Sequence, residues 1–220
     1  MFNNNQDFYP TPLNIIRNML EKVDFKMIGS VLEPSAGKGD IVSAVIDRFK
    51  IAHSACYSRE AKWDIDTIEI DENLRYILQG KKYRVVHDDF LTYDTYKKYD
   101  IIIMNPPFIE GDKHLLKALE MQEVGGQIIC LLNAETLKNP YSNTRKDLVR
   151  KLEEYNAEIT YHNSSFINAE RSTNVEIALI KINIPKVKDD SIILNQLKKQ
   201  ECFTKHQAQY DKSLINADFI

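Results

Sequence analysis

One short segment, Asn105 to Phe108, places an amide side chain, two prolines and an aromatic ring directly after an apolar run. The prolines fix a rigid backbone and leave carbonyl oxygens without a competing N–H. When two acceptors form hydrogen bonds with the two N–H groups of an exocyclic amine, the amine can lose its conjugation with the heterocycle. Its lone pair then becomes reactive. The Asn105 side-chain oxygen and the Pro106 carbonyl suit that grip, and Phe108 can stack on the ring. Asn105, Pro106, Pro107 and Phe108 are therefore predicted to be catalytic, mainly by orienting an amino group; a plain Pro-rich turn is the alternative.

A second segment, Glu33 to Asp40, reads Glu-Pro-Ser-Ala-Gly-Lys-Gly-Asp between a predicted strand and a predicted helix. Gly37 and Gly39 allow a tight turn and a close approach to a ligand, and the helix that follows offers free N–H groups to a carboxylate or phosphate. The spacing matches neither a Walker loop nor Gly-x-Gly-x-x-Gly. The segment favours a small-molecule site, with an ordinary structural turn as the alternative.

Acidic residues follow the next two predicted strands. Glu69 comes near the end of one strand, where a carboxylate can accept both hydrogens of a ribose diol. Asp89 and Phe90 come after the other, where a carboxylate can accept from an adenine amino group and the ring can pack nearby. Taken alone, each also fits a solvated acid at a strand end or in a loop. Beside the Gly-containing segment they favour a nucleoside-binding site.

The composition limits the classes of protein to consider. The 220 residues are 43% hydrophobic, 28% charged and 10% aromatic, which suits one globular domain and excludes a disordered or fibrous chain. The formal net charge of −3 lacks the basic excess of a stand-alone nucleic-acid binder, so nucleic acid would be held by a local patch. Cys56, Cys130 and Cys202 lack metal spacing and favour a reducing compartment, and we expect no metal. We find no membrane span or signal peptide and expect a cytoplasmic protein.

Short apolar runs alternate with helical patterns, which is typical of an α/β protein with a largely parallel sheet. The predicted strands are Ser30 to Glu33, Asp64 to Ile70, Tyr83 to His87, Asp100 to Met104, Gln127 to Leu132, Ile159 to His162 and Val175 to Ile182. The first predicted helix has Thr11 as its cap, Pro12 as its first residue and an apolar stripe of Leu13, Ile16, Leu20 and Val23. Further helices are predicted at Ile41 to Phe49, Asp71 to Gln79, Asp112 to Glu123 and Ser142 to Tyr155. The last two strands have no helix between them and are predicted to pair antiparallel at one edge.

In this order the segments resemble the class I S-adenosylmethionine-dependent methyltransferases with an Asn-Pro-Pro-aromatic motif, over about residues 7 to 182. The Glu-Pro-Ser-Ala-Gly loop and the upstream Tyr9-Pro10-Thr11-Pro12 segment are similar to those of N6-adenine DNA methyltransferases. The resemblance implies a Rossmann-like, seven-stranded, mostly parallel sheet with a terminal antiparallel hairpin and helices on both faces. It also implies S-adenosylmethionine as cofactor and S-adenosylhomocysteine as product. The predicted cofactor-binding residues are Tyr9, Thr11, Pro12, Glu33, Pro34, Ser35, Ala36, Gly37, Gly39, Asp40, Glu69, Ile70, Asp89, Phe90 and Asn105.

The resemblance further implies transfer of a methyl group to the N6 amino of adenine in DNA, with the base flipped into the pocket. Phe108, Phe166 and Arg171 are the predicted substrate-binding residues. The catalytic domain is predicted to span residues 1–184, and residues 185–220 are predicted to be a tail without an independent domain. That tail is too short to read base edges, so sequence recognition would need a partner subunit or a missing target-recognition domain, and an enzyme of relaxed specificity is the alternative.

Other interpretations stay open. Guanine-N2 methyltransferases of RNA share Asn-Pro-Pro-Phe, and glutamine methyltransferases of proteins use Asn-Pro-Pro-Tyr for a planar amide. A binding module that keeps the cofactor or nucleic acid without turnover is a third reading. His114 is predicted to lie on a helix surface. The basic residues that could meet phosphates, or simply form a solvated helix face, are Lys113, Lys138, Arg145, Lys146, Arg150, Lys151 and Arg171.

Overall fold

The computed structural model describes residues 10–54, 63–162 and 176–186. Its elements in chain order are α1 (Leu13–Leu20), β1 (Ser30–Glu33), α2 (Asp40–Ala52), β2 (Asp64–Ile68), α3 (Glu72–Gly80), β3 (Arg84–His87), β4 (Ile101–Met104), α4 (Gly111–Met121), β5 (Gly126–Asn133), α5 (Glu135–Lys138), α6 (Asn143–Glu154), β6 (Glu158–His162) and β7 (Ile177–Ile184). Among these described residues, none of the helices combines the length and apolar character needed to span a membrane.

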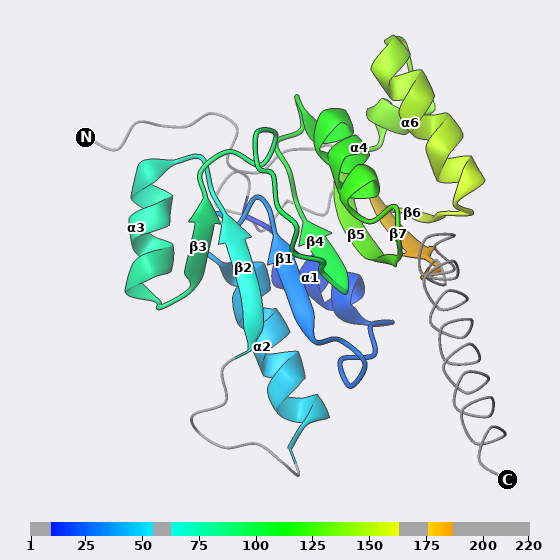
Figure 1. Ribbon diagram of the computed structural model, residues 1–220. Helices are drawn as coiled ribbons and strands as arrows, with labels where there is room; N and C mark the ends of the chain where they lie inside the picture. The colour runs from blue at the N-terminus through cyan, green and yellow to red at the C-terminus, as the bar shows by residue number, and fades with distance from the viewer. Residues whose placement is uncertain (1–9, 55–62, 163–175, 187–220) are drawn as a thin grey trace, which may run out of the picture. The chain divides into compact units, whose positions relative to one another are not determined.

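The strands form one seven-stranded sheet in the order β3-β2-β1-β4-β5-β7-β6 (Figure 1). Strands β1 to β5 pair in parallel, whereas β7 runs antiparallel to both β5 and β6. The predicted Rossmann-like sheet with a terminal antiparallel hairpin is therefore confirmed. Strand order reverses between β1 and β4, and in open α/β sheets ligands bind outside the carboxyl ends of the strands at such a point.

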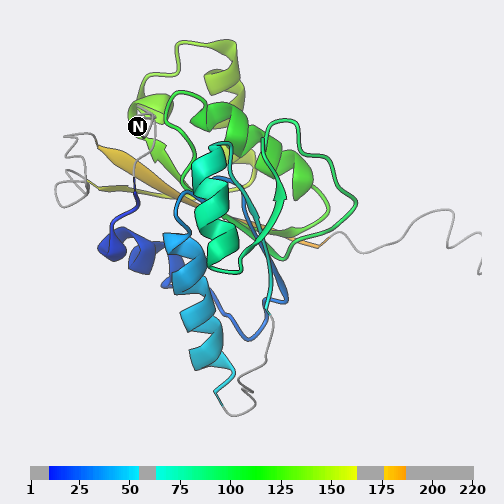
Figure 2. The same ribbon diagram turned by 90° about the vertical axis from the view of Figure 1, so that its left-hand side faces the viewer.

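Alternate residues of the strands feed two apolar clusters on opposite faces of the sheet, because successive side chains of a strand point to opposite sides. In β4, Ile101 and Ile103 join the cluster beneath α1 and α2, while Ile102 and Met104 join the cluster beneath α4 and α6. Figure 2 shows these two helix layers on either side of the sheet. The prediction of helices on both faces is confirmed.

Helix α1 differs from its prediction in its cap and at the start of its apolar stripe. Pro12, not Thr11, occupies the N-cap position, and no side chain caps the helix. Ile16 and Leu20 are buried as predicted, and Val23 packs against the same cluster just after the helix end. Leu13 is 69% exposed, whereas Ile15 and Met19, which were not part of the predicted stripe, are buried.

Candidate functional site

A cavity of about 640 Å³ opens at the carboxyl ends of β1, β2, β3 and β4. The residues that line it come from the segments that the sequence singled out and from their immediate neighbours. They are Pro10, Thr11, Glu33, Pro34, Ser35, Ala36, Gly37, Lys38, Asp40, Ile41, Glu69, Ile70, Asp71, Glu72, Asn73, Leu74, Asp88, Asp89, Phe90, Asn105, Pro107, Ile109, Glu110 and His114.

The two glycines of the β1–α2 loop have different tasks. Gly37 has a φ of 55°, lines the cavity, and donates its N–H to Glu69 Oε2 at 2.7 Å. Gly39 has a φ of 83° and precedes α2, but it does not line the cavity. A Cβ at Gly39 would lie 2.6 Å from the Tyr83 ring. Gly39 is thus explained by backbone conformation and packing against Tyr83, and a direct role with the cofactor stays a prediction.

Glu69 lies just past the end of β2 and is 7% exposed. Burial raises the pKa of its carboxyl, while the N–H groups of Asp71 and Gly37, at 2.9 and 2.7 Å, oppose that rise. Arg75 reinforces the same turn by donating to the Glu69 carbonyl at 2.9 Å and to the Ile70 carbonyl at 2.7 Å. Glu69 therefore ties the β1–α2 loop to the β2–α3 turn. Each carboxylate oxygen has a second lone pair with which to accept from a ligand hydroxyl.

Glu33 ends β1 and is 2% exposed, yet its Oε2 atom accepts no hydrogen bond from any described residue. Burial raises the pKa of this carboxyl well above its ordinary value, and the nearby charges of Asp40 and Glu69 raise it further. An unsatisfied buried acceptor costs on the order of 1–3 kcal/mol. Glu33 is therefore suited to accept a hydrogen bond from a ligand N–H or O–H group.

The motif after β4 is split between the cavity wall and the core. Asn105 and Pro107 line the cavity, and Asn105 Nδ2 donates to Thr11 Oγ1 at 2.9 Å. This bond uses the hydroxyl that the sequence had assigned to a helix cap. Pro106 is buried, and a Cβ on Gly111 would lie 3.7 Å from its ring. Phe108 is half-buried against the cluster beneath α1 and α2 rather than on the wall.

A ring pair closes the cavity beside the β3–β4 loop. Asp89 lines the cavity, and its Oδ1 accepts from Leu91 N at 2.9 Å, which fixes the turn. Phe90 is buried with its ring centroid 5.6 Å from that of His114. His114 is 7% exposed, and its Nδ1 lies 2.9 Å from the Glu110 carbonyl. Burial lowers the pKa of His114. The prediction that His114 lies on a helix surface is wrong, because the first turn of α4 faces the cavity.

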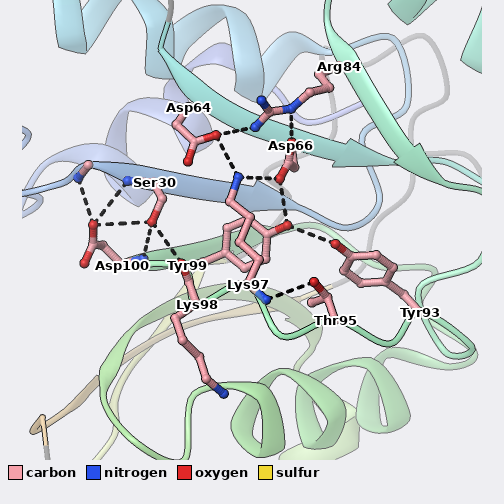
Figure 3. A network of polar contacts seen from close by, with 11 residues as sticks. Ser30, Asp64, Asp66, Arg84, Tyr93, Thr95, Lys97, Lys98, Tyr99 and Asp100 are labelled. Atoms are coloured by element: carbon pink, nitrogen blue, oxygen red, sulfur yellow. Dashed lines mark hydrogen bonds and ion pairs between the residues drawn. The ribbon is translucent and has the colours of Figure 1, made fainter.

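A network of polar contacts anchors the loop between β3 and β4 at the opposite edge of the sheet (Figure 3). Asp66 is buried on β2, where it pairs with Arg84 and accepts from Lys97 Nζ at 2.6 Å. Tyr99 also donates to Asp66 at 2.7 Å, and its hydroxyl lies 3.0 Å from that of Tyr93. The loop that carries Asp89 and Phe90 is therefore held at its far end by buried charge.

The structure brings most of the predicted cofactor-binding residues together on one wall. Among the described residues, the predicted cofactor-binding residues Pro12 and Gly39 and the predicted catalytic residues Pro106 and Phe108 do not line the cavity. Tyr9, Phe166 and Arg171 lie outside the described residues. The predicted site residues omitted Pro10, Lys38, Ile41, Asp71, Glu72, Asn73, Leu74, Asp88, Ile109, Glu110 and His114. Most of these directly follow a predicted strand or motif, a position that could have identified them, whereas His114 carried no such signal.

The cavity wall is strongly acidic. Its carboxylates are Glu33, Asp40, Glu69, Asp71, Glu72, Asp88, Asp89 and Glu110, and Lys38 is the single lysine or arginine among the described lining residues. Like charges so close together make the cavity attractive to a cationic ligand and unfavourable to phosphate groups.

Two curated relatives share sequence with part of this chain. A modification methylase, CviBIII, of Paramecium bursaria Chlorella virus NC1A is 34% identical over 85 residues, which cover 36% of this chain and 19% of that protein. A type II methyltransferase, M.CvrRI, of Paramecium bursaria Chlorella virus XZ-6E is 31% identical over 109 residues, covering 47% of this chain and 26% of that protein. The chain thus matches about a fifth to a quarter of their lengths. No family model matches the chain.

Solved structures with the same fold include methyltransferases of several kinds. The modification subunit of a proposed type I restriction enzyme from Vibrio vulnificus has a TM-score of 0.61 and 17% identity, covering 84% of this chain and 46% of that one. A dimethyladenosine transferase from Plasmodium falciparum has a TM-score of 0.53 and 16% identity over 79% and 62% of the two chains. An O-methyltransferase from Bacillus cereus, in complex with S-adenosylhomocysteine, has a TM-score of 0.51 and 14% identity over 80% and 83%. The chain therefore has the fold of S-adenosylmethionine-dependent methyltransferases, and part of it is similar in sequence to a modification methylase and a type II methyltransferase, in agreement with the expected resemblance.

Proposed function

We propose that this chain transfers a methyl group from S-adenosylmethionine to the N6 amino group of an adenine in DNA. The observation that carries the proposal is the position of Asn105, which lines the cavity beside Glu33 and Glu69 and is oriented by Thr11 at 2.9 Å. An amide directed at a nucleoside-sized cavity suits an amino acceptor. The partial relationship to DNA modification methylases favours DNA as the substrate.

The residues of the cavity fit the cofactor. Its volume of about 640 Å³ lies in the range typical of small-molecule sites. The Glu33 carboxyl offers a buried acceptor to an ammonium or hydroxyl group, and Glu69 lies where a ribose diol can donate to it. The acidic wall favours a ligand that carries a sulfonium cation. When bound, the cofactor supplies an activated methyl group and its own leaving group.

The protein's own part of the reaction is orientation. We propose that the Asn105 side-chain oxygen and the Pro106 carbonyl oxygen each accept a hydrogen bond from one N–H group of the amino group. The lone pair of the amino nitrogen then turns toward the cavity. Thr11 fixes the Asn105 amide by accepting from Nδ2, and this leaves Oδ1 as the atom that meets the substrate. Phe108 packs against the core, so stacking on the base requires its ring to turn outward. The adenine must leave the duplex, because its amino group is paired and stacked there.

The test is a parallel methyl-transfer assay with labelled S-adenosylmethionine on duplex DNA, single-stranded DNA and RNA, followed by mass spectrometry of the digested nucleosides. We expect N6-methyladenine from DNA. Asn105→Ala is expected to lower the rate by about 100-fold or more. Thr11→Val keeps the shape of the side chain but removes the acceptor for Asn105, and should lower the rate by about tenfold.

Other products would change the proposal. N2-methylguanine from RNA, or methylation of a protein amide, would replace adenine in DNA as the substrate. Cofactor binding without any product from these acceptors would favour a binding module or dependence on a partner subunit. An unchanged rate in Asn105→Ala would remove the amide from the mechanism.

A further inference from the structure

An exposed aromatic ring stands on the segment that enters α6. Tyr141 is 77% exposed and lies between Pro140 and Ser142. Its own N–H donates to the Asn139 carbonyl at 2.9 Å, and Ser142 caps α6 by accepting from Arg145 N at 3.2 Å. The proline, the turn and the helix cap hold the backbone of Tyr141, so the ring costs little conformational entropy to place.

Arg145 links this ring to the first turn of α4. Its guanidinium carbon lies 4.5 Å from the Tyr141 ring centroid, and its Nε lies 3.9 Å from Asp112 Oδ2. Asp112 is in the first turn of α4, two residues after Glu110 of the cavity wall. The guanidinium therefore covers one face of the ring and leaves the other face to solvent, next to the helix that bounds the cavity.

The charge of this surface differs from that of the cavity. Arg150 is neutralised by Asp147 and Glu154, at 2.6 and 2.5 Å. The exposed Lys146 ammonium pairs with no side chain in the part of the chain that the structure describes. Phosphates are repelled by the acidic wall at the carboxyl ends of β1 to β3, so a nucleic acid whose base enters the cavity has to place its backbone on another side. The α6 side offers an uncompensated cation there.

We propose that Tyr141, Arg145 and Lys146 form a nucleotide-binding surface beside the cavity. Tyr141 stacks on a base next to the target adenine in the same DNA strand, Arg145 holds the ring, and Lys146 contacts a phosphate. This inference rests on the proposed function and names residues that contact its substrate. A partner protein suits the surface less well, because the surface carries the exposed Lys146, and lysine is depleted at protein–protein interfaces.

The experiment measures the affinity of the full chain for a fluorescently labelled, adenine-containing DNA duplex by anisotropy over a series of salt concentrations. Cofactor affinity is measured by calorimetry on the same samples. Tyr141→Ala is expected to weaken DNA binding about tenfold, with Tyr141→Phe close to the unsubstituted protein. Lys146→Gln is expected to reduce the salt dependence by about one unit of slope at equal cofactor affinity.

Two matched controls come from the opposite edge of the sheet. Tyr96 and Lys98 lie in the loop just before β4 and are exposed. Tyr96→Ala and Lys98→Gln should leave DNA affinity and its salt slope unchanged. Equal losses in these controls would mean a nonspecific effect of surface change, and the proposal would be wrong.

The outcomes separate this inference from the proposed function. If the unsubstituted chain methylates DNA and Tyr141→Ala binds DNA equally well, only the surface is wrong. If the chain binds cofactor but neither binds nor methylates DNA, the proposed function fails and the surface fails with it. If Tyr141→Ala weakens binding to an RNA of the same sequence and leaves DNA binding intact, the surface is an RNA site and the DNA proposal is overturned.

Discussion

The acidic wall of the cavity and the neighbouring surface at the start of α6 differ in charge and in the way their side chains are held. On the side of β1 to β3, Glu33 and Glu69 are buried, and burial raises the pKa of each carboxyl. On the side of α4 and α6, Tyr141 and Lys146 are exposed beside Arg145. The first side is fixed by backbone hydrogen bonds to carboxylates, such as Gly37 to Glu69, and the second by a helix cap and a ring contact.

This difference is what the two proposed ligands of opposite charge would require, the cofactor in the cavity and DNA on the surface beside it. Buried acids next to a small enclosed volume favour a cationic small molecule, because attraction is strong where water is excluded. Exposed cations and rings favour a long polyanion, which binds at the surface and gains by releasing counterions. Changes on the acidic side should therefore alter cofactor affinity, and changes on the α6 side should alter nucleic-acid affinity.

The largest expected effect comes from the network beneath the acidic side. Asp66→Asn removes a buried charge that Arg84 and Lys97 both contact, and should lower the free energy of unfolding by about 3 kcal/mol. Because the network holds the loop of Asp89, cofactor affinity should fall as well. Urea denaturation and calorimetry measure the two effects.

Asp64→Asn is the matched control for that substitution. Its side chain is 42% exposed and binds the same two cations, so the loss should stay under about 1 kcal/mol. Burial raises the pKa of Asp64, but hydrogen bonds from Lys97 and Arg84 lower it more, and the net pKa is lowered. This contribution is present above the ordinary carboxyl pKa and is lost as pH falls through the lowered value. Equal stability losses in both variants would contradict the distinction between buried and exposed charge.

Glu33→Gln should act in opposite directions on stability and on binding. It removes a buried carboxyl whose Oε2 accepts no hydrogen bond from described residues, so the ligand-free chain should gain about 1 kcal/mol. The same substitution should lower the affinity for S-adenosylmethionine about tenfold and leave the affinity for DNA unchanged. Because the pKa of the Glu33 carboxyl is raised, this acid should lower the stability of the fold as the pH rises through that raised pKa. Glu33→Gln should lack this pH dependence of stability. Unchanged cofactor binding would remove Glu33 from the cofactor site.

The smallest expected effect is the pH dependence of stability that His114 contributes. Burial lowers its pKa in the folded chain, so its contribution to stability is present above the ordinary histidine pKa and is lost as pH falls through the lowered value. In the unsubstituted chain, His114 should lower the free energy of unfolding by less than about 1 kcal/mol as the pH falls from 7 to 5, and His114→Gln should remove this change. Thermal melts of both proteins across that interval test it.

The sequence was sufficient to predict the sheet and most residues of the acidic cavity wall. Strand limits agreed within a few residues, because apolar runs bounded by glycine, proline and acids leave little freedom in a parallel sheet. The four-residue helix α5 was not predicted, since so short a helix has no periodicity to detect. The apolar stripe of α1 was predicted correctly at Ile16 and Leu20 but not at Leu13, which the packing of the helix leaves exposed.

The sequence by itself determined which chemical groups follow each strand, because a parallel sheet gathers the carboxyl ends of its strands at one edge. Glu33, Glu69, Asp89 and Asn105 meet around one cavity for that reason. Only the tertiary structure decided that Thr11 orients Asn105 across 94 residues, that Gly39 packs against Tyr83, and that His114 faces inward. These outcomes depend on how separate elements pack against one another, and residue order alone does not encode which of their faces meet.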